Sequence, residues 1–284
     1  MSMHATQRPF NVQIMMPPDD MDLDQLTQIY EATGMGADVF VEVLHSRDAL
    51  GGAIFVATDG ETVIGTASAV AFGLSGWIGG VAVLPRWRRG GVGTALTRVA
   101  VDWLAAHDVR TTFLLATAAG RAVYQRLGFE REEHYAFFAV PERSRPSPSP
   151  HLRAGRADDL DLVIQMYRNA TGETRDALIA RSWPVGGTLF ERDGVAIGFS
   201  LASDWEIAAI AVSEDPEVGY ALLDAVVAGD DRTLRVPVPL NDDRFVKLLE
   251  QHGYVEMWRA QRMRLGPPIP RGPQVRLAGN FYWG

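Results

Sequence analysis

The fold can be worked out from one stretch, Val81-Ala82-Val83-Leu84-Pro85-Arg86-Trp87-Arg88-Arg89-Gly90-Gly91-Val92-Gly93-Thr94-Ala95-Leu96. It predicts a strand that ends at a proline, then a basic glycine-rich loop, then a helix. The first N–H groups of a helix have no partner within it, and the helix dipole places positive charge at the same end. Three arginines between positions 86 and 89 add charge. A solvated surface loop is the alternative, but arginines beside three glycines at a helix start favour an anion site, and we predict that it binds a pyrophosphate.

The composition limits the kinds of protein that the chain can be. Its 284 residues suggest two domains, and hydrophobic residues, at 47%, are enough for sizeable cores. No apolar run approaches the roughly 18 residues of a membrane-spanning helix, so we expect no membrane partner. The net charge of −8 argues against a general nucleic-acid binder. The basic loop is therefore a local feature that needs a local reason.

Cysteine is absent from the sequence, which excludes disulfides, a thiol nucleophile and thiolate metal ligands. Residues 1–6 contain no apolar secretory segment. Both observations fit a cytoplasmic protein, which we expect. We also expect no metal, because the histidines have no ligand spacing and the acidic residues 19–24 lack the glycine and terminal glutamate of a calcium loop.

Hydrophobic periodicity and turn residues predict strands and helices on both sides of the basic loop. In the first half the predicted helices lie at residues 19–34, 38–46, 93–106 and 121–127, and the predicted strands at 12–15, 53–58, 62–72, 75–83, 111–116 and 134–140. Asp59-Gly60 supplies a hairpin turn. Gly79-Gly80 inside a strand predicts a bulge or the close approach of another backbone.

A linker is predicted at residues 141–150, Pro141-Glu142-Arg143-Ser144-Arg145-Pro146-Ser147-Pro148-Ser149-Pro150. Proline and serine alternate there, which keeps the backbone extended and prevents a core from forming. We therefore expect one domain at residues 1–140 and a second at residues 151–284.

The second half repeats the first. Seven matches occur in the same order, with offsets that drift between about 125 and 139 residues. They pair Asp19-Asp20-Met21-Asp22-Leu23 with Asp158-Asp159-Leu160-Asp161-Leu162, Gln28-Ile29-Tyr30 with Gln165-Met166-Tyr167, Ala32-Thr33-Gly34 with Ala170-Thr171-Gly172, Asp59-Gly60 with Asp193-Gly194, Val81-Ala82-Val83 with Ile210-Ala211-Val212, Gly93-Thr94-Ala95-Leu96 with Gly219-Tyr220-Ala221-Leu222, and Gly128-Phe129 with Gly253-Tyr254. Chance would supply one or two matches, so we predict two copies of one α/β unit.

The two copies differ at the loop. The second copy has Val212-Ser213-Glu214-Asp215-Pro216-Glu217-Val218-Gly219, which is three residues shorter, with one glycine instead of three and three acids in place of three arginines. Negative side chains repel a pyrophosphate. Tyr124, four residues before Gly128, is replaced in the second copy by Leu249. We infer that the first half carries the chemistry and the second half supports it.

These residues resemble the GNAT family of N-acetyltransferases. Arg88-Arg89-Gly90-Gly91-Val92-Gly93 is similar to motif A of the family, Gln/Arg-x-x-Gly-x-Gly/Ala, and Ala122-Val123-Tyr124-Gln125-Arg126-Leu127-Gly128-Phe129 is similar to motif B. The first half is covered fully, and the second half is similar to a degenerate copy. The resemblance implies an α/β (α+β) fold of two tandem GNAT-like units, each with a mixed, mainly antiparallel central sheet flanked by helices.

The resemblance also implies acetyl-CoA as cosubstrate. Val81 and Val83 would pair through their backbones with the pantetheine arm, and the backbone near Val81 and Ala82 would polarise the thioester carbonyl. Thr117 stands seven residues before the motif B tyrosine, where the family often has an Asn that contacts pantetheine. The pyrophosphate would be held by the backbone N–H groups of Arg88, Arg89, Gly90, Gly91, Val92, Gly93 and Thr94.

Tyr124 would protonate the departing CoA thiolate. Taken alone it could be a core tyrosine, but the basic loop and Gly128-Phe129 favour the acid. An amine that attacks a thioester builds an oxyanion and expels a thiolate, so fixed N–H donors and a nearby acid lower the barrier. Many family members carry a Glu on the strand that holds the oxyanion donors, but residues 75–83 contain no acid. The general base is therefore unassigned, with water, Asp38 and Glu42 as candidates.

The expected function is acetyl-CoA-dependent N-acetyltransfer to a primary amine of a small molecule, by direct attack on the thioester. A non-catalytic CoA-binding sensor or interaction protein is one alternative, and acetylation of a protein amine is another. Met35, Phe40 and Trp77 are candidates for the acceptor pocket. The chain is expected to be a monomer that forms its own pseudo-dimer, or a homodimer. Its tail, Phe281-Tyr282-Trp283-Gly284, is expected to pack across the domain interface, with a place in the acceptor pocket as the alternative.

Overall fold

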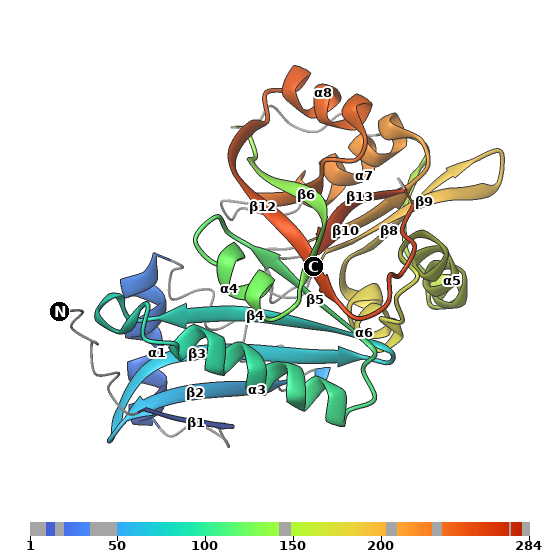
Figure 1. Ribbon diagram of the computed structural model, residues 1–284. Coiled ribbons are helices and arrows are strands. Elements are labelled where there is room, and N and C mark those ends of the chain that lie inside the picture. Colours follow the sequence, from blue (N-terminus) through green and yellow to red (C-terminus); the bar gives the residue numbers. More distant parts are fainter. Residues whose placement is uncertain are drawn as a thin grey trace.

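The computed structural model describes residues 10–14, 20–34, 50–141, 149–202, 209–228, 235–272 and 274–279 (Figure 1). The elements of the first half are β1 (Asn11–Ile14), α1 (Asp20–Thr33), β2 (Ala53–Asp59), β3 (Thr62–Phe72), β4 (Ser75–Val83), the 3₁₀ turn η1 (Pro85–Trp87), α3 (Val92–Ala106), β5 (Thr111–Ala116), α4 (Arg121–Arg126) and β6 (Glu130–Ala139). The expected bounds of β3, β4 and β5 are confirmed. The helix expected at 38–46 lies outside the described residues.

The helices and strands of the second half follow the order of those described in the first, with α6 and the C-terminal β13 in addition, which confirms the repeat. They are β7 (Leu152–Ala154), η2 (Ala157–Asp159), α5 (Leu160–Thr171), α6 (Asp176–Gly186), β8 (Gly187–Arg192), β9 (Val195–Ala202), β10 (Ala209–Ser213), α7 (Pro216–Ala228), β11 (Arg235–Pro239), α8 (Asp243–Gln251), β12 (Val255–Leu265) and β13 (Val275–Gly279). Most of the expected linker, residues 142–148, lies outside the described residues, so the domain boundary stays a prediction.

The strands form two sheets, and strands of the two halves alternate at one end of the larger sheet. The larger sheet has the order β1-β2-β3-β4-β5-β12-β6-β11, and the smaller has the order β13-β10-β9-β8-β7. β12 of the second half lies between β5 and β6 of the first, and β6 of the first half lies between β12 and β11 of the second. Figure 1 shows β6 and β12 side by side at the centre of the molecule. The eight-stranded sheet is therefore built from both copies.

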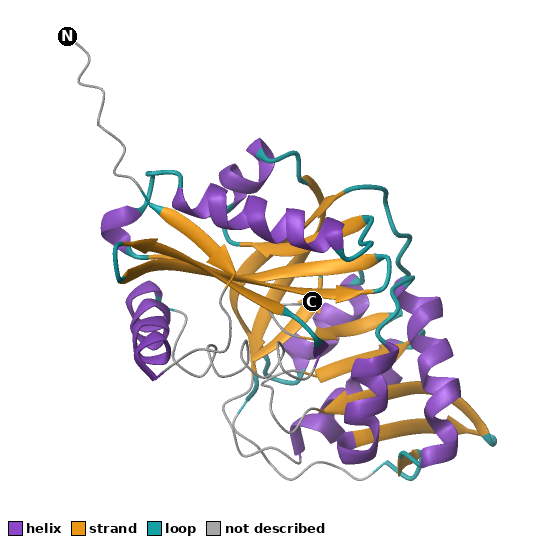
Figure 2. Ribbon diagram, turned by 90° about the horizontal axis from the view of Figure 1, so that it is seen from below, coloured by secondary structure: helices purple, strands orange, loops and turns teal. Residues whose placement is uncertain are grey.

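The larger sheet is mixed and mainly antiparallel, as expected, whereas the described ladders of the smaller sheet are all antiparallel. Among the described ladders only β4 and β5 pair in parallel. Alternate residues of β2 face opposite sides, since Ile54 and Val56 pack with α1 residues such as Tyr30, whereas Phe55 packs with α3 residues such as Leu96. Figure 2 shows helices on both sides of the strands. Each face of the first half thus has its own hydrophobic core.

β6 begins at Glu130, four residues earlier than the sequence pattern predicted. Residues 130–133 are all charged and carry no apolar alternation. Their carboxylates are instead paired across the sheet, where Arg264 of β12 forms ion pairs with Glu130 at 2.5 Å and Glu132 at 2.9 Å. Cross-strand ion pairs stabilise a strand that apolar burial alone would not predict.

Candidate active site

β4 and β5 separate part of the way along their length. They pair only from Ser75 and Thr111 to Trp77 and Phe113. Beyond this point β5 continues to pair with β12 on its other side, as far as Ala116. The edge of β4 that faces β5 therefore has no described ladder partner over residues 78–83. Backbone N–H and C=O groups on such an edge are available to an extended ligand.

A bulge in β4 lies in the separated part. Thr66 of β3 is opposite Ala82, whereas Ser68 is opposite Gly79, so two residues of β4 face one residue of β3. Gly80 has a positive φ of 56°, which favours glycine, and its carbonyl accepts a hydrogen bond from the Tyr30 hydroxyl at 3.4 Å. The bulge expected at Gly79-Gly80 is confirmed. It bends β4 away from the regular ladder at the predicted oxyanion donors.

The basic loop runs from the end of β4 to the start of α3. Trp87 is buried and anchors η1, and the Arg88 side chain donates from Nε to the Val83 carbonyl at 3.1 Å. Arg89 and Gly91 have positive φ values of 63° and 87°. Successive residues with alternating handedness turn their N–H groups toward one side, which forms an anion-binding concavity.

The first turn of α3 is open to a ligand. Its N-cap residue is Gly91, and no side chain caps the helix there. A Cβ placed on Gly93 would have its nearest neighbour, Val83 Cγ2, at 3.7 Å, which is ordinary contact distance. The side chain of Val92 is 1% exposed and fixes the helix to the core, so only its backbone is available. With Thr94 in the same turn, the loop residues predicted to hold a pyrophosphate surround one helix start.

Tyr124 lies on α4, which follows the end of β5 that has separated from β4. It belongs to the same buried cluster as Trp87 and Ala116, and Val81 and Val83 pack against that cluster. Its side chain is 8% exposed, and burial raises the pKa of its hydroxyl to about 12. The hydroxyl is therefore protonated at neutral pH and able to donate a proton.

Thr117 closes the turn between β5 and α4. Its carbonyl accepts hydrogen bonds from the N–H groups of Gly120 and Arg121, both at 3.1 Å, and its hydroxyl accepts from Gly120 N–H at 3.4 Å. Gly120 is needed here, because a Cβ at this position would be 2.9 Å from Cε2 of Tyr124. The turn thus places the tyrosine ring, and Thr117 acts on it through the backbone.

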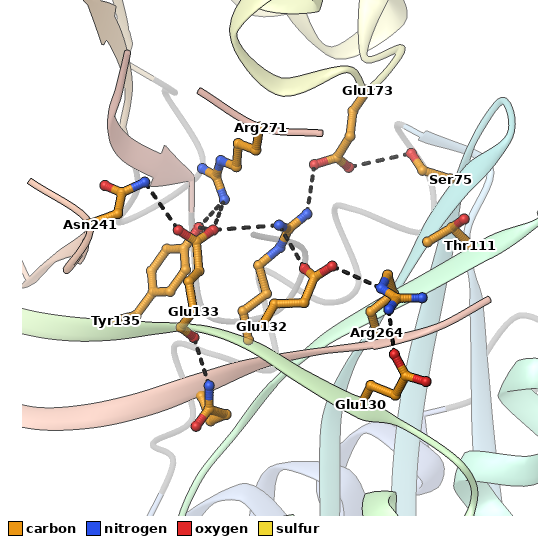
Figure 3. Close-up of polar contacts among 12 residues, drawn as sticks. Ser75, Thr111, Glu130, Glu132, Glu133, Tyr135, Glu173, Asn241, Arg264 and Arg271 are labelled. Atoms are coloured by element: carbon orange, nitrogen blue, oxygen red, sulfur yellow. Dashed lines mark hydrogen bonds and ion pairs between the residues drawn. The ribbon is translucent and has the colours of Figure 1, made fainter. Parts of the chain in front are cut away.

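A buried polar cluster lies where β4 and β5 begin to separate, at the start of the opening between these two strands (Figure 3). The sequence did not predict this cluster. Glu173, between α5 and α6, accepts hydrogen bonds from Trp77 Nε1 at 2.8 Å and Ser75 Oγ at 3.3 Å. Ion pairs join it to Arg175 at 3.2 Å and Arg262 at 3.6 Å. Trp77 and Glu173 are 96 positions apart in the sequence, and neither residue alone points to the contact.

The cluster continues away from β4 along β6. Arg262 also forms ion pairs with Glu132 at 2.9 Å and Glu133 at 3.4 Å, and Arg271 forms one with Glu133 at 2.9 Å. The Arg262 guanidinium lies 4.0 Å from the centre of the Phe113 ring. Burial alone would raise the pKa of the Glu173 carboxyl, but the arginines and Trp77 outweigh it and lower the pKa. Glu173 is therefore ionised.

Several expected acceptor and base residues are not placed. Met35, Asp38, Phe40 and Glu42 lie outside the described residues. Trp77 is 1% exposed, packed against Phe113 and bonded to the cluster, so it is a core residue in this structure. In the described ranges no group of three or more histidines or acids could hold a metal ion. None of the described helices is both long and apolar enough to cross a membrane.

Two family models match the chain. The model described as the acetyltransferase (GNAT) family matches residues 23–129, and the model described as an acetyltransferase (GNAT) domain matches residues 163–278. A search of the curated proteins finds no match to the chain. The first match contains β4, the basic loop and Tyr124, and the second covers the repeat.

Solved structures with the same architecture cover nearly the whole chain. A putative acetyltransferase from Pyrococcus horikoshii has a TM-score of 0.78 at 17% identity, over 97% of this chain and 96% of that one. A tandem GNAT protein from the clavulanic acid biosynthesis pathway has a TM-score of 0.60 at 14% identity, over 92% and 100%. A glucosamine N-acetyltransferase region of a fungal β-N-acetylglucosaminidase has a TM-score of 0.68 at 10% identity, over 90% and 38%. The chain thus consists of two GNAT acetyltransferase domains in tandem.

Proposed function

We propose that the protein is an acetyl-CoA-dependent N-acetyltransferase that acetylates a primary amine of a small molecule. The observation that carries the proposal is the opening between β4 and β5, which leads from the bulge at Gly80 to the uncapped start of α3. An extended donor with a pyrophosphate at one end matches this combination of a free strand edge and an anion site.

Each part of the donor has a place in this proposal. The pyrophosphate binds the N–H groups of residues 88–94, and the pantetheine arm pairs with the backbone of Val81 and Val83. The thioester carbonyl accepts from the backbone near Ala82, where fixed N–H donors stabilise the developing oxyanion. The nitrogen of the amine attacks the carbonyl carbon, the C–S bond breaks, and Tyr124 gives its proton to the CoA sulfur.

The proton of the amine needs a separate route. A primary amine is mostly protonated at neutral pH, and β4 carries no acid. Glu173 reaches β4, but its two arginine partners lower its pKa, which makes it a weak base, and its side chain is 2% exposed. We therefore assign Glu173 to the structure of the opening. Water and the loop carboxylates of Asp38 and Glu42 remain the candidates for the base.

A small-molecule acceptor is supported by one structural relative, the fungal protein region that is described as a glucosamine N-acetyltransferase. A protein amine remains the alternative acceptor, and a CoA-binding sensor without turnover remains the alternative of a different class. We expect one chain to act as its own pseudo-dimer, because β6 of the first half and β12 of the second already pair within one sheet. We keep the cytoplasm as the expected location.

The test is release of the CoA thiol from acetyl-CoA over a panel of amines, with amino sugars, polyamines, amino acids and a lysine peptide. Turnover with a small amine supports the proposal. Binding of acetyl-CoA without turnover on any amine favours the sensor. Failure to bind acetyl-CoA would refute both.

A further inference from the structure

The C-terminal strand β13 occupies the place in the second half that the opening has in the first. β10 corresponds to β4 in the repeat, and it pairs with β9 on one side as β4 pairs with β3. On its other side β4 has no ladder partner among the described residues beyond Trp77, whereas β10 pairs with β13 over Ala209–Val212. β13 also contacts β11, the counterpart of β5. A segment of this chain thus lies where an extended ligand would lie in the first half.

A bulge in β13 aims one side chain at the loop. Ala211 is opposite Leu277 and Val212 is opposite Val275, so Arg276 is the extra residue. Its guanidinium donates from Nε to the Ser213 carbonyl at 3.1 Å and from Nη2 to the Glu214 carbonyl at 2.6 Å. Arg276 is 1% exposed. A buried cation therefore sits against the acidic loop that replaces the basic loop of the first half.

The space above the helix start is also filled. A Cβ on Gly93 of α3 would meet only ordinary contacts, but a Cβ on its counterpart Gly219 of α7 would lie 2.6 Å from Cγ of Arg276. In addition, the Asp215 side chain accepts a hydrogen bond from Glu217 N–H at 3.0 Å, within the first turn of α7. The positions that leave α3 open are thus taken by side chains at α7.

The third contact of Arg276 reaches the helix that corresponds to α4. Its Nη1 bonds to Asp242, the N-cap residue of α8, whose side chain also accepts from the N–H groups of Arg244 and Phe245. Arg276 thus joins the loop after β10 to the start of α8. In the first half, the ligand in the opening would lie between the corresponding elements.

We propose that β13 and Arg276 permanently occupy the cofactor cleft of the second half, so that the chain binds one acyl-CoA and binds it only in the first half. The proposal rests on the proposed function for the identity of the cofactor. The backbone of β13 takes the place of the pantetheine arm along β10, and the guanidinium takes the place of the anion with the opposite charge, held by the Ser213 and Glu214 carbonyls and the Asp242 carboxylate.

The first experiment counts binding events by isothermal titration of the full chain with CoA. We expect one CoA per chain, and no event of wild-type affinity in the Arg88→Glu, Arg89→Glu double variant. Two CoA molecules per chain, or one that keeps its affinity in the double variant, would overturn the proposal. No binding to the wild-type chain refutes the proposed function instead, and the second experiment then decides the occupancy of the second cleft.

The second experiment measures amide hydrogen exchange of residues 275–279 without and with saturating CoA. We expect these amides to be protected in the free protein and unchanged by CoA, while residues 88–94 gain protection. Arg276→Gln should raise their exchange rate at least about tenfold, because three hydrogen bonds from a buried cation are lost. The matched control is Arg259→Gln, which removes an exposed ion pair with Glu256. Rapid exchange in the free wild-type protein, or a loss of protection on adding CoA, contradicts the proposal.

Discussion

The indole Nε1 of Trp77 donates a hydrogen bond of 2.8 Å to the carboxylate of Glu173, and this contact joins the two halves of the chain where β4 and β5 begin to separate. Both side chains are almost fully buried. Arg175 and Arg262 neutralise the carboxylate from the second half. The second copy thus contacts the region of the predicted site through a buried ion cluster.

Glu173→Gln should destabilise the chain, because it keeps the shape of the side chain and removes the buried carboxylate that Arg175 and Arg262 share. Breaking a buried ion pair in this way costs about 3 kcal/mol, which lowers the Tm by roughly 6–12 °C in a chain of this size. Thermal unfolding followed by circular dichroism measures the change. Glu256→Gln is the control, because its partner Arg259 is exposed, and we expect a change below about 1 kcal/mol. Equal effects of the two variants would show that the buried cluster contributes no more than a surface pair.

The stabilisation from Glu173 should depend on pH. Its pKa is lowered in the folded state, so it binds fewer protons there than in the unfolded chain, where its pKa is about 4.3. Its contribution is therefore complete above that value and lost as the pH falls through the folded pKa. The difference in Tm between the wild type and Glu173→Gln should shrink as the pH is lowered from 5 to 3. A constant difference would contradict the assigned direction of the pKa shift.

Tyr124→Phe should lower kcat at least about a hundredfold, since a positioned general acid contributes factors of this size. The KM for acetyl-CoA should change little, because the phenyl ring keeps its packing against Phe129. Steady-state kinetics with the best amine of the panel gives both values. Tyr254→Phe, a buried tyrosine of the second half, is the matched control and should keep kcat. An unchanged kcat in Tyr124→Phe means that Tyr124 is a core residue only.

The rate should also hold at alkaline pH. Burial raises the pKa of the Tyr124 hydroxyl to about 12, so the acid keeps its proton well above the pKa of 10 for an exposed tyrosine. We expect kcat measured from pH 8 to 10.5 to show no fall due to this group. A falling limb near pH 10 that is present in the wild type and absent in Tyr124→Phe would contradict the shift.

The elements near the site could be predicted from the sequence because their signals are local. Asp59-Gly60, Gly79-Gly80 and Pro85 mark turns, bulge and strand end by their own backbone preferences, and the buried strand at 111–116 is apolar throughout its centre. The internal repeat served as a control, because the second copy keeps the strand and the helix but lacks the arginines and two of the three glycines of the loop. On that basis Arg88, Arg89 and Gly91 could be predicted to bind the cofactor and not to be required by the fold.

The alternation of strands from the two halves and the buried cluster could not be predicted in the same way. They depend on pairs that are far apart in sequence, such as Glu132 with Arg264 and Trp77 with Glu173, and each partner alone is a common surface or core residue. β13 follows a proline-rich segment and has only five residues. Its role is defined by the edge of β10 that it covers, which the sequence of either segment does not reveal.

The arginines of the basic loop should act on the pyrophosphate and on no other part of the donor. Arg88 and Arg89 are exposed, and the Arg88→Glu, Arg89→Glu variant reverses two charges beside the start of α3. We expect its KM for acetyl-CoA to rise by about 10- to 100-fold at low salt, and the factor to shrink at 0.5 M salt because exposed charges are screened. S-acetyl-pantetheine lacks the pyrophosphate, so its use as a donor should be the same in variant and wild type. Arg98→Glu, an exposed charge reversal further along α3, is the control and should change neither donor by more than about twofold. An equal loss with both donors would mean that the substitutions distort the opening, and the pyrophosphate would then have to be assigned elsewhere.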